Sequence, residues 1–152
     1  MKKIACVLVF ALLMSTSLFA VNQGEDAKKD ITKLVKNCYF NGAFNGLDTK
    51  AMKKGFHSDF AVYSKDGKKV EKFTISKWIE TIEKNKNSKG FNPDKVKALC
   101  KIVELDVTGD AATVKAEIYK NQKKVYTDYL SLIRSDDGWK IISKVYHNHI
   151  GN

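Results

Sequence analysis

Apolar residues in the first part of the chain recur at a helical period. The spacing predicts a long helix over residues 25–44, which Asn45-Gly46 ends because glycine commonly follows the last helical residue. A short second helix is expected directly after it, with Asp48 or Thr49 at its N-terminus. The residues that set the first helical period are Ile31, Leu34, Val35 and Cys38.

Beyond residue 55 the pattern changes to the alternation that is typical of strands. Asp66-Gly67 lies between two short alternating segments and predicts a hairpin turn, and a third helix capped by Thr74 or Ser76 is expected after it. From Leu99 onward apolar residues recur with a period of two between turn sequences, which indicates antiparallel strands. These elements predict an α+β fold: N-terminal helices packed on a curved antiparallel sheet that consists of a small hairpin and a four-stranded C-terminal meander.

The first twenty residues have the pattern of a signal peptide. Lys2 and Lys3 precede an apolar run, and small or uncharged residues follow it up to Ala20. The apolar run is shorter than a membrane-spanning helix requires, so no stable membrane insertion is expected after cleavage. We therefore expect residues 1–20 to be removed, and residues 21–152 to form one exported domain, periplasmic or secreted.

The chain is basic, with 27 Lys and Arg against 17 Asp and Glu and a net charge of +10. The lysines are scattered and Arg134 is the single arginine, which favours a solvated basic surface and argues against a nucleic-acid partner. Cys38 and Cys100 are compatible with a disulfide or with two small buried side chains. The sequence contains no zinc-type spacing, so neither a metal nor a cofactor is expected.

Several segments resemble a known family. "FHSDFAVY", "LDVTGDAATVKAE" and "YTDYLSLIRSDDGWKIISKVYH" are similar to the "putative lumazine-binding" family of the nuclear transport factor 2-like superfamily. The resemblance implies a cone in which three N-terminal helices pack on a bent sheet that wraps around the first helix. It also implies a pocket for a small cyclic molecule, in a fold that hosts enzymes, binding proteins and transport adaptors.

The last hairpin places polar side chains among apolar ones. A two-residue turn at Asp137-Gly138 sets Asp128 opposite His147, close enough for a carboxylate to hydrogen-bond an imidazole. A three-residue loop would instead set Asp128 opposite Tyr146 and would group the leucines of the first strand with lysines. The first register is favoured because its shared face is apolar. The apolar residues of that face are Leu130, Leu132, Trp139, Ile141 and Val145.

These residues suggest a ligand pocket between the first helix and the sheet. The leading hypothesis is a non-catalytic domain that binds a small, partly apolar or anionic molecule. One alternative is a lyase or isomerase that resembles polyketide cyclases or ketosteroid isomerases and uses Asp128 or His147 as a base. A protein-interaction module is a third possibility. The candidate ligand contacts are Tyr39, His57, Tyr63, Asp128 and His147, of which Asp128 and His147 are also the catalytic candidates.

The other face of the hairpin is predicted to be the interface of a homodimer. It is too apolar to remain in water, and a two-fold axis would cover it by packing sheet against sheet. The residues expected there are Tyr129, Ile133, Ile142 and Tyr146.

Overall fold

The computed structural model describes residues 24–150, and the expected signal peptide lies outside this part of the chain. One continuous helix covers residues 24–45, and its second half is the π-helix η1 (Val35–Asn45). It is followed by α2 (Thr49–Gly55), α3 (Ile75–Lys86) and the short 3-10 helix η2 (Pro93–Lys95). The strands are β1 (Phe56–Asp66), β2 (Lys69–Thr74), β3 (Leu99–Thr108), β4 (Ala111–Lys120), β5 (Lys123–Ser135) and β6 (Gly138–Asn148).

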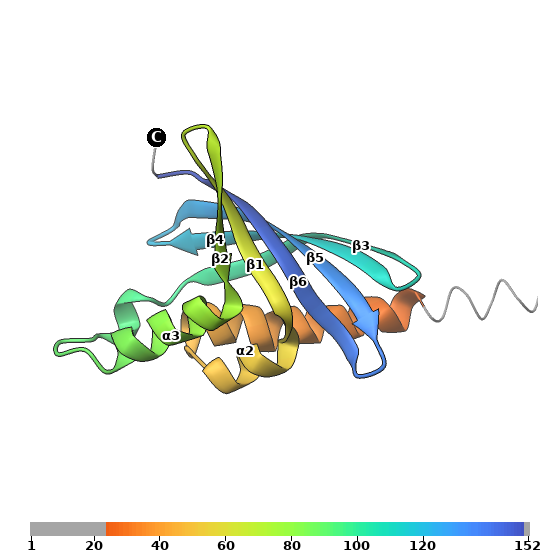
Figure 1. Cartoon of the computed structure of the whole chain (residues 1–152), viewed down its shortest axis with the longest axis horizontal. Helices are drawn as coiled ribbons and strands as arrows, with labels where there is room; N and C mark the ends of the chain where they lie inside the picture. Colours follow the sequence, from red (N-terminus) through yellow and green to blue (C-terminus); the bar gives the residue numbers. More distant parts are fainter. Residues whose placement is uncertain (1–23, 151–152) are drawn as a thin grey trace, which may run out of the picture.

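The six strands form one sheet in the order β2-β1-β6-β5-β4-β3. The meander β3 to β6 is antiparallel as predicted, but β1 pairs with β6 in parallel, so the sheet is mixed. The sheet bends over the first helix and the helices lie on its concave side, while the β1–β2 hairpin extends away from them (Figure 1). This arrangement confirms the predicted α+β cone.

Local sequence explains where the helices begin. The Asp48 carboxylate accepts hydrogen bonds of 3.0 Å from the backbone N–H groups of Lys50 and Ala51, which caps α2. Thr74 caps α3 by accepting a hydrogen bond from the backbone N–H of Lys77. Both caps are residues that the sequence indicated.

The first helix differs from the expected regular α-helix. From Val35 to Asn45 it is π-helical, and the backbone N–H of Gly46 donates to the carbonyl of Asn41 at 2.7 Å. This segment carries Tyr39 and Phe40, which face the sheet and are buried. The π-helical segment therefore supplies aromatic side chains to the cone, while the α-helical turns before it supply Ala27 and Ile31.

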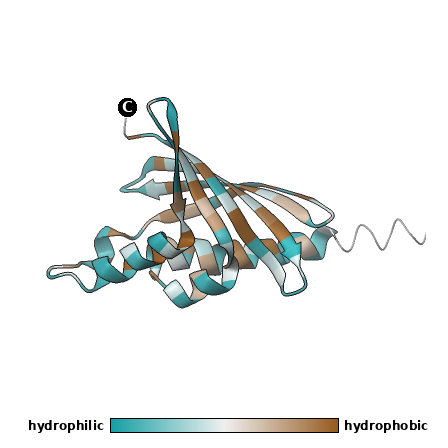
Figure 2. Cartoon of the chain, in the orientation of Figure 1, coloured by the Kyte–Doolittle hydropathy of each residue, from teal (hydrophilic) through white to brown (hydrophobic). Residues whose placement is uncertain are grey.

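Aromatic rings pack together in the interior of the cone. Tyr39 contacts Phe44 edge to face with ring centroids 5.5 Å apart, and Phe56 contacts Phe60 in the same way at 4.7 Å. The hydrophilic residues gather at the turns and on the outer helix surfaces (Figure 2). The rings of this cluster belong to Tyr39, Phe40, Phe44, Phe56, Phe60 and Trp78.

A β-bulge at Ile142 controls which side chains of β6 enter the core. Ser131 pairs with Ser143 but Leu132 pairs with Ile141, so Ile142 is an extra residue in β6. Because side chains alternate along a strand, one extra residue reverses the faces beyond it. Ile141 points inward before the bulge and Lys144 points inward after it.

The predicted register of the last hairpin is therefore wrong. The turn residues are Asp136 and Asp137, and Asp128 lies opposite Tyr146 rather than His147. Val145, expected on the apolar inner face, is 49 % exposed on the outer face opposite Tyr129. The expectation failed for two reasons: it placed the turn one residue too late, at Asp137-Gly138, and it assumed unbroken alternation through β6.

The outer face of the sheet retains part of the predicted apolar surface. Tyr129 is 48 % and Ile133 42 % exposed, and Val145 is beside them. Tyr146 does not belong to this face, because the bulge turns it to the concave side, and Ile142 is only partly exposed.

Helix α2 packs closely against the first helix through glycine. A Cβ atom on Gly55 would lie 2.3 Å from the Cβ of Cys38, a distance that no pair of side chains tolerates. Cys38 and Cys100 are both free thiols, so the disulfide that the sequence allowed is absent from the described residues. Each cysteine is partly buried, in agreement with the alternative of small packing side chains.

We predict that Gly55→Ala destabilises the protein by about 1–3 kcal/mol, because overpacking forces the two helices apart. Gly24→Ala is the matched control, since a Cβ at Gly24 meets no atom within 4 Å. Urea unfolding measures both free energies. A Gly55→Ala protein as stable as the wild type would show that the helices separate at no cost.

Candidate functional site

Three polar side chains from three distant elements meet in the interior. Tyr39 comes from the first helix, Asp128 from β5 and Lys144 from β6. Tyr39 and Asp128 are fully buried, and Lys144 is 7 % exposed. We call these three residues the buried polar triad.

The tyrosine hydroxyl joins the two charged groups. It donates a hydrogen bond of 2.5 Å to Oδ2 of Asp128 and accepts one of 2.9 Å from Nζ of Lys144. Nζ also lies 3.1 Å from Oδ1 of Asp128, an ion-pair distance. Apart from this ion-pair contact, Oδ1 accepts no hydrogen bond from the described residues, so it keeps a free lone pair.

Four aromatic rings surround the ammonium group of Lys144. Its Nζ lies 5.1 Å from the ring centroid of Tyr146, 5.4 Å from those of Tyr39 and Trp78, and 6.0 Å from that of Tyr126. These distances are those of cation–π contacts. Tyr39 is sealed in the core, whereas Trp78, Tyr126 and Tyr146 are partly exposed. The three outer rings therefore separate the buried polar triad from solvent.

Burial alters the proton affinity of the groups in this region. Desolvation, and then the charge of Asp128, raise the pKa of Tyr39 well above its usual value and keep its hydroxyl protonated. Desolvation lowers the pKa of Lys144, and the nearby Asp128 carboxylate opposes that shift. Burial and Asp128 together raise the pKa of the Cys100 thiol to about 11.

The structure brings together only two of the five candidate residues, Tyr39 and Asp128. His57 lies at the start of β1, partly exposed, where its Nδ1 accepts a hydrogen bond of 3.1 Å from the backbone N–H of Asp59. Tyr63 is partly exposed further along the same strand, in register with the outward-facing Val145.

His147 points away from the buried polar triad. It lies opposite Thr127 on the exposed side of β6, with its ring 4.6 Å from that of His149. The proposed pair of Asp128 and His147 does not exist. Lys144 takes the place that the sequence interpretation gave to the histidine.

Two surface cavities are relevant to ligand access. A cavity of about 710 Å³ lies beside the turn between β4 and β5, lined by Lys97, Lys101 and Lys120 together with Tyr119 and amide side chains, and none of its lining residues is acidic. The hydroxyl of Tyr119 donates a hydrogen bond of 2.5 Å to Glu117. Tyr119 is next to Ile118, the partner of Tyr126, so the two tyrosines lie near the same end of β4 but on opposite faces of the sheet. Another cavity of about 510 Å³ lies beside His57, between β1 and α3.

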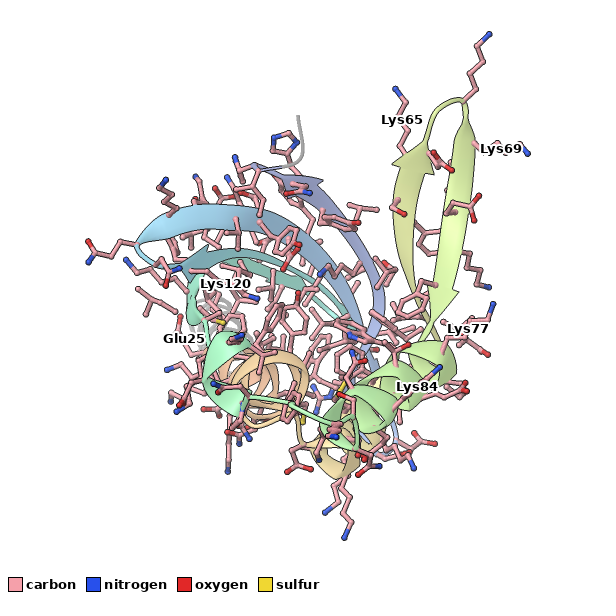
Figure 3. The ribbon with its side chains drawn as sticks, turned by 90° about the vertical axis from the view of Figure 1, so that its left-hand side faces the viewer. Glu25, Lys65, Lys69, Lys77, Lys84 and Lys120 are labelled. Atoms are coloured by element: carbon pink, nitrogen blue, oxygen red, sulfur yellow. The ribbon has the colours of Figure 1, made fainter. Side chains whose placement is uncertain are left out.

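Within residues 24–150, no three His, Cys, Asp or Glu side chains are grouped closely enough to hold a metal ion. The helices of that region also include none with the length and apolar character needed to cross a membrane. The labelled lysines at the sheet hairpins and on α3 project outward and are dispersed over the molecule (Figure 3).

Comparison with protein families identifies the fold family. Residues 26–147 match the family model described as "Putative lumazine-binding". The chain belongs to this family. Membership supports a small-molecule-binding domain, and it agrees with the resemblance of the hairpin sequences. The site of this family member nevertheless contains Lys144, which the sequence interpretation did not select.

Similar proteins include one curated enzyme. This chain is 27 % identical to aldolase FrzH from a Cladobotryum species over 113 residues. The aligned region covers 74 % of this chain and 84 % of the aldolase.

Solved structures of nuclear transport factor 2-like proteins have the same fold. A protein of unknown function from Methylobacillus flagellatus is 26 % identical to this chain, with a TM-score of 0.60. The superposition covers 82 % of this chain and 93 % of the other. A protein of unknown function from Silicibacter pomeroyi is 19 % identical, with a TM-score of 0.64, and the superposition covers 82 % of this chain and 98 % of the other.

We predict that breaking the buried ion pair costs much stability. Asp128→Leu leaves a buried ammonium without its anion, and Lys144→Met leaves a buried carboxylate without its cation, so each should lose about 3–5 kcal/mol. The double variant should lose less than the sum of the two, because it removes both charges.

Urea unfolding of the two single variants and the double variant measures this coupling. Lys115→Met is the control, because Lys115 forms an ion pair with Glu104 at 2.8 Å on the exposed outer face. This substitution should lower the free energy of unfolding by less than about 1 kcal/mol. Additive losses in the double variant would contradict a direct ion pair.

Proposed function

We propose that the chain is an exported domain that binds a small, planar, partly apolar molecule with an acidic or anionic group. The ligand would lie against Trp78, Tyr126 and Tyr146, above Lys144. The observation that carries this proposal is the buried ammonium within four aromatic rings, three of which are partly exposed.

The energetics of the buried polar triad favour a functional role. Removing two charges from water costs several kcal/mol, and a core of this volume can be packed at least as well with apolar side chains. A cation beneath exposed rings instead offers a ligand both stacking area and electrostatic attraction. This combination suits an aromatic heterocycle of the lumazine type, the ligand class in the family's description.

The lysine-lined cavity supports an acidic ligand. Three lysines line it, whereas one carboxylate, that of Glu117, is hydrogen-bonded to a lining residue, so positive charge predominates there. It lies at the end of β4 where Ile118 pairs with Tyr126, although on the other face of the sheet. An anion would therefore be attracted to this end of the sheet.

An enzymatic role is the second candidate. The aldolase relative favours it, because aldolases act on carbonyl compounds and the triad holds an amine, a hydroxyl and a carboxylate in contact. Any such chemistry would use Asp128 with Tyr39 and Lys144, since His147 is on the other face of the sheet.

We expect lumazine to bind the wild-type protein and Trp78→Leu to weaken binding about tenfold, equivalent to ~1.4 kcal/mol, through loss of stacking. Tyr129→Leu is the matched control, because Tyr129 is 48 % exposed on the outer sheet face. Isothermal titration calorimetry at constant pH measures the three affinities. Equal affinities for both variants, or no binding to the wild type, would refute the proposed site.

We also propose that the outer sheet face forms a homodimer through Tyr129, Ile133 and Val145, which are 48 %, 42 % and 49 % exposed. Ile133→Lys should give monomers, because it places a charge in a desolvated contact. Val70→Lys, at a residue 73 % exposed on the edge strand β2, should remain dimeric. Sedimentation equilibrium separates the states, and a monomeric wild type at high concentration would reject the dimer.

A further inference from the structure

Lys144 differs from every other lysine of residues 24–150, because it alone is buried. Its ammonium group has lost most of its water and has exchanged it for aromatic faces, the Tyr39 hydroxyl and the Asp128 carboxylate. Such an environment favours the neutral amine more than water does. An amine in this state is a nucleophile, whereas exposed lysines at neutral pH are ammonium ions.

The proton of Lys144 has an acceptor within reach. Oδ1 of Asp128 lies 3.1 Å from Nζ and carries a free lone pair among the described residues. Transfer of the proton along this contact converts a buried ion pair into a neutral amine and a neutral carboxylic acid. The other titratable groups around the amine are the hydroxyls of Tyr39, Tyr126 and Tyr146.

We propose that Lys144 captures a small aldehyde or ketone as a reversible imine. The amine lone pair attacks the carbonyl carbon, the nitrogen gives up one proton and the carbonyl oxygen takes one up, which gives a neutral carbinolamine. The hydroxyl group of the carbinolamine then takes up a second proton and leaves as water, and the nitrogen loses its remaining proton, so amine plus carbonyl compound gives imine plus water. The reaction requires no oxidant or reductant.

Asp128 and Tyr39 can move the protons that this reaction needs. Asp128 receives the first proton from Lys144 and can return one to the departing hydroxyl. The Tyr39 hydroxyl contacts both Nζ and Oδ2, so it can pass a proton between them, and its raised pKa keeps it protonated. The rings of Trp78, Tyr126 and Tyr146 cover the amine and are partly exposed, so a carbonyl compound would approach from this side by displacing a ring from the amine.

This inference rests on the proposed binding site, but it does not require a lumazine-type ligand. If the protein forms the imine but does not bind lumazine, the inference stands and the proposed ligand class is wrong. If the protein binds lumazine but forms no imine, the proposed function stands and the inference is wrong.

The test is reductive trapping of the wild-type protein with pyruvate and sodium cyanoborohydride at pH 6, followed by peptide mapping by mass spectrometry. At this pH exposed lysines are protonated, so we expect Lys144 to be modified at least tenfold faster than any of them. Modification that favours exposed lysines, or no modification at all, would overturn the inference. Pyruvate is chosen because its carboxylate suits the lysine-lined cavity.

Variants then separate chemistry from accessibility. Tyr39→Phe should slow the trapping several-fold and Lys144→Arg should abolish the Lys144 adduct, while Lys115→Arg on the outer face should leave the rate unchanged. Circular dichroism in the aromatic region checks that each variant is folded. If Lys144→Arg does not fold, the wild-type peptide map still decides between the outcomes. An unchanged rate in Tyr39→Phe would remove the hydroxyl from the proton path.

Discussion

The contact between Asp128 and Lys144, joined by the Tyr39 hydroxyl, constrains the rest of the molecule. It connects β5, β6 and the first helix in a region from which water is excluded. A charge left alone there is very unfavourable, so the three elements must keep their relative positions to within hydrogen-bond tolerance. The register of the last hairpin and the rotation of the helix about its axis are therefore coupled through one polar contact.

The aromatic residues determine whether this contact can take part in ligand binding. A polar group that is sealed by aliphatic side chains can only stabilise or destabilise the fold. Here the outermost cover consists of partly exposed rings, and Lys144 lies directly beneath them. The same rings shield the ammonium group and present a flat surface to a ligand, so binding and core structure share the same side chains.

Most of the fold follows from the sequence because its signals are local. The caps Asp48 and Thr74, the helical period of the first helix and the alternation of the meander each depend on neighbouring residues. The site depends instead on one irregularity. Alternation predicted that Val145 faces inward, whereas the bulge at Ile142 places Lys144 there. The sequence did offer the correct pairing of Asp128, in the alternative register that groups Leu130 and Leu132 with lysines. We rejected that register because its shared face was less hydrophobic. The local pattern of hydrophobic residues cannot show that a buried lysine on β6 will be neutralised by a distant carboxylate on β5.

The bulge also shows how tolerant this interior is of a change in strand length. Ile142 is the residue of β6 without a partner, so loss of its codon would leave Ser143 opposite Ser131 and Lys144 opposite Leu130, and the lysine would still face inward. The pairing with β5, and not the number of residues in β6, determines which side chain enters the interior. Sequences that differ by a one-residue gap in this strand can therefore share the same ionic interior.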